Sequence, residues 1–271
     1  MGDNWARYLR QQAELGGAEI YLSSSPPIPS ESPPPPRSEP PAGVDSGPKQ
    51  ERTVSSTDIR WMKDAPSLPG PGLVVQPPVP ILIGDPVAGL ETLDAVAAMV
   101  RECRLCGLSS GRTNAVPGEG NPRAGLMCVG EGPGATEDEL GRPFVGQAGK
   151  LLDQILGAID CPRESVFIAN IVKCRPPQNR KPLPDEAAAC LPYLHRQIAL
   201  VRPKVLLALG GTAAEWLLGV RKSLGELRNQ VHRYGEIPLV VTYHPAALLR
   251  NPNWKKPTWD DVRIARQLLD A

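Results

Sequence analysis

Four short stretches after residue 124 are apolar almost throughout, and helix-like stretches separate them. The apolar stretches are GLMCVG (125–130), SVFIANIV (165–172), VLLALG (205–210) and LVVTYH (239–244). The stretches between them, such as 146–159, repeat apolar residues at helical spacing. Continuously apolar strands that alternate with helices are typical of a parallel sheet covered on both faces. The sequence therefore predicts a three-layer α/β/α fold with a central, mostly parallel four-stranded sheet.

The prolines lie mainly before this pattern: 17 of the 32 fall between Pro26 and Pro86. That stretch has few apolar residues to bury, and proline favours extended backbone, so disorder with polyproline character is predicted there. A short amphipathic helix is predicted at 3–16. We expect an N-terminal extension over 1–90 and one domain over 91–271, which is long enough to bury a core.

The charges divide unevenly along the chain. Residues 1–92 carry 7 Lys and Arg against 11 Asp and Glu, whereas residues 93–271 carry 23 against 18. A positive surplus on the predicted domain is compatible with a phosphate-backbone partner without requiring one. No stretch is apolar for long enough to span a bilayer, and the N-terminus lacks the apolar core of a signal peptide. A cytoplasmic protein with no membrane partner is predicted.

Polar residues stand at the ends of three predicted strands. Glu131 lies between Gly130 and Gly132 after the first strand, Asn170 lies near the end of the second, and His244 ends the fourth. Each alone fits a structural role, as a helix cap, a turn residue or a strand end. In parallel sheets, however, ligands bind beyond the carboxyl ends of the strands. A carboxylate, an amide and an imidazole at one edge together predict an active site.

Four of the six cysteines form two pairs. Cys103 and Cys106 make a C-x2-C motif, and Cys174 and Cys190 follow far downstream. In a reducing compartment such a motif indicates a metal site more often than a disulfide. Four thiolates suit either a tetrahedral zinc ion or an iron–sulfur cluster. The alternative is two structural thiols beside an unrelated C-x2-C, and the spacing alone leaves it open.

Five motifs follow one another between Cys103 and Pro252: CRLC, GEGPG, GRPFVG, NIVKCRPP with its later cysteine, and YHPAALLR. In this order they resemble the family 4 uracil-DNA glycosylases, the iron–sulfur branch of that superfamily. The resemblance covers about the C-terminal two-thirds of the chain. It implies a DNA repair enzyme that hydrolyses the N-glycosidic bond of uracil after base flipping. The products would be free uracil and an abasic site.

The resemblance also implies roles for single residues. Asn170 would accept a hydrogen bond from uracil N3–H and donate one to O4, and Phe144 would stack on the base. His244 would donate to uracil O2 as a neutral imidazole, and Glu131 would position or activate the attacking water. The other implied residues are the base contacts Gly130 and Gly132, Glu137 where thymine carries its methyl, Leu248 and Leu249 as a wedge in DNA, and Arg250 on phosphate.

For the cysteines, the resemblance favours a [4Fe–4S] cluster held by Cys103, Cys106, Cys174 and Cys190, with zinc as the alternative. The cluster would be structural, because all four ligands are used. The implied partner is uracil-containing DNA, single- or double-stranded, bound by a monomer that works at the bacterial nucleoid. The long N-terminal extension departs from the family's pattern, and we expect it to recruit a replication or repair protein.

A second hypothesis is a low-turnover module that binds uracil-DNA or recognises damage on the same scaffold. A related branch of the superfamily traps its product through an extra histidine in a basic insertion. This chain has three histidines, His195, His232 and His244, and the segment VKCRPPQNRKP that follows Asn170 contains none. That difference argues against trapping.

Overall fold

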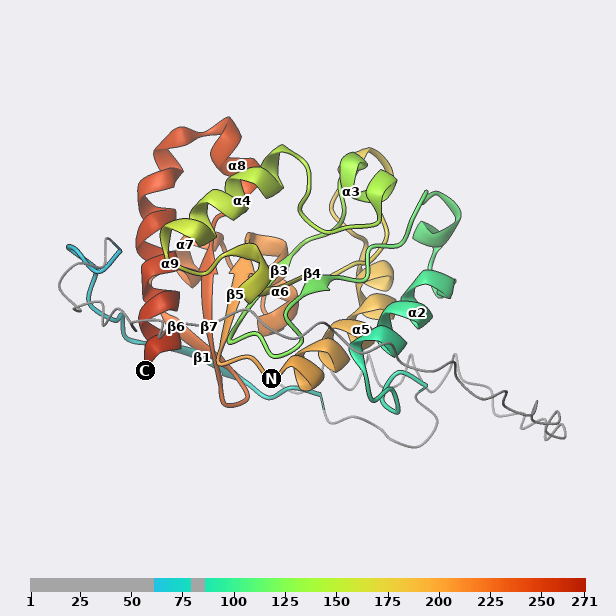
Figure 1. Cartoon of the computed structure of the whole chain (residues 1–271), viewed down its shortest axis with the longest axis horizontal. Coiled ribbons are helices and arrows are strands. Elements are labelled where there is room, and N and C mark those ends of the chain that lie inside the picture. Colours follow the sequence, from blue (N-terminus) through green and yellow to red (C-terminus); the bar gives the residue numbers. More distant parts are fainter. Residues whose placement is uncertain (1–60, 79–85) are drawn as a thin grey trace, which may run out of the picture. The chain divides into compact units, whose positions relative to one another are not determined.

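The computed structural model describes residues 61–78 and 86–271, and within them one mixed sheet lies between helices (Figure 1). Its seven strands run in the order β1-β6-β7-β5-β3-β4-β2 across the described part. The strands are β1 (Pro71–Val75), β2 (Glu119–Gly120), β3 (Leu126–Gly130), β4 (Phe167–Asn170), β5 (Val205–Leu209), β6 (Val231–Tyr234) and β7 (Ile237–Thr242).

The four predicted strands are the centre of this sheet. They are β7, β5, β3 and β4, which lie next to one another in that order and are parallel throughout. Every residue of β3, β4 and β5 is buried, as their apolar composition requires. The predicted α/β class and the parallel centre are therefore confirmed.

The sheet has three more strands than predicted. β2 has only two residues, and it pairs antiparallel with β4. β6 reads Val-His-Arg-Tyr, which carries polar residues at two of four positions, and it pairs antiparallel with β7. β1 begins at Pro71 inside the proline-rich stretch and pairs with β6. Such short or polar strands lack the continuous apolar run that marked the central four.

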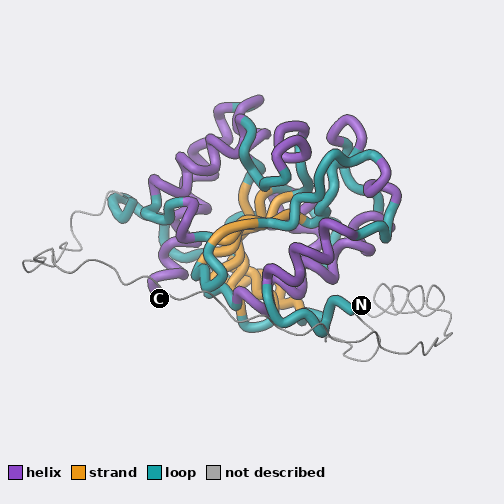
Figure 2. The backbone as a smooth tube through the Cα atoms, turned by 45° about the vertical axis from the view of Figure 1, so that its right-hand side comes forward, coloured by secondary structure: helices purple, strands orange, loops and turns teal. Residues whose placement is uncertain are grey.

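Eight α-helices flank the sheet in the described residues. They are α2 (Leu93–Glu102), α3 (Ala135–Leu140), α4 (Gln147–Ala158), α5 (Pro184–Val201), α6 (Gly211–Leu218), α7 (Leu224–Leu227), α8 (Pro245–Arg250) and α9 (Lys255–Asp270). Figure 2 shows helices on both sides of the strands. Pro184 occupies the first turn of α5, where its missing N–H costs nothing.

Neighbouring residues of each central strand enter different cores. Met127 and Val129 of β3 join a cluster with side chains of α2, α5 and α6. Leu126 and Cys128 join another with side chains of α4 and α9. Successive strand residues point to opposite faces, so both faces of β3 are covered and the three-layer arrangement follows.

Residues before 91 also contribute to this fold. Trp61 is 1% exposed and packs in the core beside α4 and α9, and β1 forms an edge of the sheet. The predicted helix at 3–16 and most of the predicted extension lie outside the described residues. Among the described helices, none is both long and apolar enough to cross a membrane.

Candidate active site

The carboxyl ends of the central strands bring the predicted polar residues to one edge. Gly130 at the end of β3 lies directly beside Asn170 at the end of β4. Gly210 N–H, just after β5, donates to the carbonyl of Thr242 at the end of β7 (2.8 Å). Two residues later the chain reaches His244. The topology thus gathers Glu131, Asn170 and His244 where parallel sheets bind ligands.

Asn170 offers an unpaired acceptor at this edge. The residue is 1% exposed, and its Oδ1 has no hydrogen-bond partner within the described part of the chain. A Cβ on Gly130 would come within 2.5 Å of that oxygen, so only glycine leaves the approach open. Buried polar atoms are nearly always paired. An unpaired one at a strand end is best explained by a ligand that supplies the donor.

Phe144 lies beside Asn170 and His244. Its ring would contact a Cβ on Gly130, and its centroid is 5.4 Å from that of His244. The backbone of Phe144 has φ of 50°, a conformation that costs a non-glycine residue about 1–3 kcal/mol. Arg163 stabilises it by donating to the Phe144 carbonyl (2.9 Å). The loop is therefore held in a strained shape that presents an aromatic ring.

Glu137 supports the same loop from the other side. One carboxylate oxygen accepts from the N–H groups of Val145 (2.9 Å) and Gly146 (2.8 Å), and the other accepts from Gly134 (3.2 Å). These three bonds tie the start of α3 to the segment after Phe144. In this structure the Glu137 carboxylate is thus engaged with backbone, which fixes the position of both loops.

His244 is held in one tautomer. Its Nδ1 accepts from the N–H of Ala246 at the start of α8 (3.2 Å), so in the neutral ring the proton is on Nε2. Burial, with a smaller effect from Arg250, lowers the pKa of His244 to about 4. The imidazole is consequently neutral at physiological pH and retains an Nε2–H donor. Gly210, whose φ is +96°, leaves room for it, because a Cβ there would meet the His244 Cβ at 3.0 Å.

The other two histidines have structural environments. His232 is fully buried, accepts from the N–H of Leu73 at Nδ1 (2.9 Å) and contacts the carbonyl of Leu227 through Nε2 (2.6 Å). His195 lies in α5, with its ring 6.2 Å from that of Tyr234. His244 is therefore the histidine that the fold places at the candidate site.

Glu131 follows β3 directly and is half-buried. Its backbone carbonyl accepts from the N–H of Val172 (3.1 Å), which fixes the main chain beside β4. Within the described residues its carboxylate has no hydrogen-bond or ion-pair partner. A carboxylate held in this way is free to accept a hydrogen bond from water.

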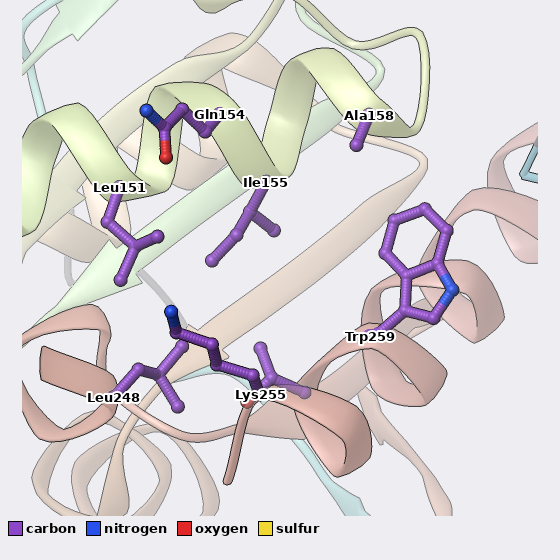
Figure 3. Close-up of a pocket in the computed structure, with 8 residues that line it drawn as sticks. Leu151, Gln154, Ile155, Ala158, Leu248, Lys255 and Trp259 are labelled. Atoms are coloured by element: carbon purple, nitrogen blue, oxygen red, sulfur yellow. The ribbon is translucent and has the colours of Figure 1, made fainter. Parts of the chain in front are cut away.

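The two leucines of YHPAALLR face in different directions. Leu248 is 1% exposed and Leu249 is 47% exposed. Leu248 faces Leu151 and Ile155 of α4 across a cavity of about 190 Å³, which Lys255 and Trp259 also line (Figure 3). Arg250 follows at the end of α8 and is exposed. Leu248 thus anchors α8 to α4, and Leu249 and Arg250 face outward.

The four paired cysteines come from two regions of the fold. Cys103 and Cys106 follow α2, Cys174 follows β4, and Cys190 lies in α5. All are free thiols. Cys106, Cys174 and Cys190 each interact electrostatically with at least one other member of this set. Burial raises the pKa of Cys190 to about 12, so without a metal its thiol would stay protonated.

Within the residues that the structure describes, no group of three or more His, Cys, Asp or Glu side chains is arranged to hold a metal ion. The donor set still has the chemistry of a sulfur-ligated centre. Cys174 Sγ accepts from Arg112 (3.0 Å) and Cys190 Sγ accepts from the N–H of Lys173 (3.2 Å). Such N–H···S bonds stabilise thiolates and tune iron–sulfur centres.

Sequence reasoning missed two residues that support the site. Lys173 is fully buried, and its ammonium donates to the carbonyl of Asn170 (2.8 Å) and to Gln197 (2.7 Å). Arg163 holds the Phe144 loop from a separate segment. Lys173 could have been found from the sequence, because it is a lysine beside Cys174 in an otherwise apolar stretch. Arg163 carries no comparable mark, since only the folded chain brings it to the loop.

Comparisons with known proteins agree with this geometry. The family model of the uracil DNA glycosylase superfamily matches residues 117–265. The type-4 uracil-DNA glycosylase of Sulfurisphaera tokodaii is 45% identical over 188 residues, which are 66% of this chain and 86% of the relative. The type-4 enzyme of Thermotoga maritima is 45% identical over 66% of this chain and 95% of the relative's length. The type-5 uracil-DNA glycosylase of Thermus thermophilus is 35% identical over 149 residues, which are 48% of this chain and 68% of the relative.

The sheet carries a carboxylate, an amide and a neutral imidazole at its carboxyl edge. Together with the match over 117–265, this arrangement identifies the chain as a member of the uracil DNA glycosylase superfamily. Type-4 relatives at 40–45% identity cover about two thirds of the chain. Within the superfamily, the chain belongs to the type-4 uracil-DNA glycosylases.

Proposed function

We propose that this uracil-DNA glycosylase hydrolyses the N-glycosidic bond of a flipped deoxyuridine with Asn170, His244 and Glu131 in separate roles. The observation that carries the proposal is the buried, unpaired Oδ1 of Asn170 beside the Phe144 ring. A base inside a duplex cannot reach such a pocket, so the nucleotide leaves the stack at a cost of a few kcal/mol.

Base recognition follows from the amide of Asn170. Its Oδ1 accepts from uracil N3–H, which supplies the missing donor, and its amino group donates to O4. Cytosine has an acceptor at N3 and a donor at C4, so it would leave both groups of this amide unpaired. Phe144 stacks on the base face, and the peptide groups around Gly130 and Gly132 border the base. Glu137 accepts three backbone hydrogen bonds that hold the loop after Phe144 in place. We propose that this loop closes the space where thymine would carry its methyl group.

The bond breaks as the sugar gains oxocarbenium character and uracil leaves as an anion. The Nε2–H of His244 donates to O2, where negative charge develops. Donors already oriented toward developing charge are usually the largest single catalytic contribution. The Glu131 carboxylate accepts a proton from the attacking water and also stabilises the sugar cation. Water oxygen then bonds to C1′, the departing base takes up a proton from solvent, and Glu131 returns its proton to solvent.

Contacts with DNA are proposed for α8. Leu249 is exposed and would enter the gap that the flipped nucleotide leaves, as apolar wedges do in other DNA-bending proteins. Arg250 would bind phosphate beside it. Leu248 holds the helix on α4 so that both residues are presented to the DNA.

For the four cysteines we propose a [4Fe–4S] cluster with Cys103, Cys106, Cys174 and Cys190 as ligands. When bound, it supplies structural cross-linking and no chemistry to the glycosidic bond. Cys174 lies four residues after Asn170, and Lys173 joins the two through its bond to the Asn170 carbonyl. Fixing Cys174 therefore fixes the segment that positions the recognition amide.

The Asn170→Ala variant tests the recognition role. It removes both hydrogen bonds to the base, and a lost pair of this kind costs about 1–3 kcal/mol, or roughly 5- to 150-fold in excision rate. Binding of non-specific DNA should remain close to the parent, because phosphate contacts dominate it. Single-turnover excision and DNA affinity are measured on the same preparation. Excision by Asn170→Ala at the parental rate would contradict the proposed role.

A further inference from the structure

A basic recess lies outside the candidate site at the carboxyl edge of the sheet. Its volume is about 690 Å³, and four arginines line it: Arg101, Arg104, Arg112 and Arg142. None of its lining residues carries a carboxylate. A concave surface whose charged lining residues have one sign concentrates anions.

Two of these arginines are free to bind a ligand. Arg101 in the last turn of α2 and Arg104 between the first two cysteines are exposed. In the described chain neither side chain forms an ion pair. Arg112 is instead oriented by the fold, donating to Cys174 Sγ and to the carbonyl of Arg101. Arg142 is held by a two-point contact with Glu119 (2.8 and 3.0 Å). Two oriented arginines thus border two unpaired ones.

The recess lies close along the chain to the proposed base site. Gly141 and Arg142 line the recess, and Phe144, two residues later, lies beside Asn170 at the candidate site. A nucleotide whose base binds at that site would have the phosphates of its neighbours close to this surface. Guanidinium groups bind phosphate oxygens in bidentate geometry, which suits a backbone ligand.

We propose that this recess binds the sugar–phosphate backbone of the substrate strand next to the flipped uridine, through Arg101 and Arg104. The proposal rests on the proposed function and adds a second DNA contact, distinct from the one at α8. It also assigns the segment around Cys103 and Cys106 a part in DNA binding, because Arg104 lies between these two cysteines. Arg112 joins the carbonyl of Arg101 to Cys174.

The test uses R101Q, R104Q and the double variant on the full chain. Affinity for a strand with non-hydrolysable 2′-fluoro-deoxyuridine is measured over a range of salt concentrations. Each lost phosphate contact reduces the steepness of log affinity against log salt by about 0.7–0.9, so each variant should bind about five- to eightfold more weakly at 0.1 M salt. The loss should appear in KM while the single-turnover rate at saturation is kept, because the contact is remote from the reacting bond.

R123Q is the matched control. Arg123 is also exposed, but it lies just before β3, at the opposite edge of the sheet from the site. The R123Q variant removes the same charge as R101Q or R104Q. Because Arg123 does not line the recess, R123Q should leave the slope of log affinity against log salt unchanged. If the double variant has the slope of R123Q, the recess does not bind the backbone. If R104Q disturbs the neighbouring cysteines, as iron content and the unfolding midpoint would show, the slope of R101Q decides. A parent that fails to excise uracil would overturn the proposed function instead, so the two failures are distinguishable.

Discussion

The His244→Ala variant should excise uracil about 10²–10³-fold more slowly than the parent in single turnover. The loss corresponds to one oriented donor, the Nε2–H, which we propose donates to the O2 of the leaving base. The ring is already neutral, since burial lowers its pKa to about 4. Its contribution should therefore stay constant as the pH falls through 6.5, where an exposed imidazole would become protonated.

Two controls separate catalysis from packing. The thermal unfolding midpoint of His244→Ala is measured on the same preparation, and it should stay close to that of the parent. His244→Gln places an amide donor at about the position of Nε2 and should recover part of the rate. A lowered midpoint with an unchanged rate would show instead that His244 only caps α8.

The Cys190→Ser variant should lose the bound metal and most of its soluble yield. Cys190 is buried in α5, and its sulfur accepts from the N–H of Lys173. A structural metal site contributes its binding free energy directly to folding. Parent protein purified without oxygen should carry about four iron and four sulfide per chain, and the variant should carry neither.

Cys161→Ser is the matched control for this prediction. Cys161 is also buried and accepts from Arg266 (3.3 Å), but it belongs to the other core cluster, beside α4 and α9. Its iron and sulfide should equal those of the parent. Stoichiometric zinc without sulfide in the parent would contradict the iron–sulfur assignment.

The central sheet was predictable because strands buried on both faces require apolar residues at successive positions, and such runs are visible in the sequence. β3, β4 and β5 are apolar at nearly every position, and their ends mark the carboxyl edge. Because Glu131, Asn170 and His244 stand at the ends of parallel strands, they were predicted to come together at that edge. Their grouping depends only on strand direction, which the alternation with helices determines.

Other features depend on tertiary contacts that no local pattern encodes. Leu248 and Leu249 are chemically identical neighbours, and only the packing of α8 on α4 decides that the first is buried. Arg163 lies 19 residues after Phe144, yet it holds the carbonyl of that residue. The left-handed backbone of Phe144 is similarly a property of the assembled loop.

The most direct test of the account is the release of free uracil from oligonucleotides by the purified protein. A strand with one deoxyuridine is compared with matched strands that carry cytosine or thymine at the same position. Uracil should be released in multiple turnovers, leaving an alkali-sensitive abasic site, and the two control strands should stay intact. Tight binding of the uracil strand without release of the base would contradict the proposed function and would favour a damage-recognition module.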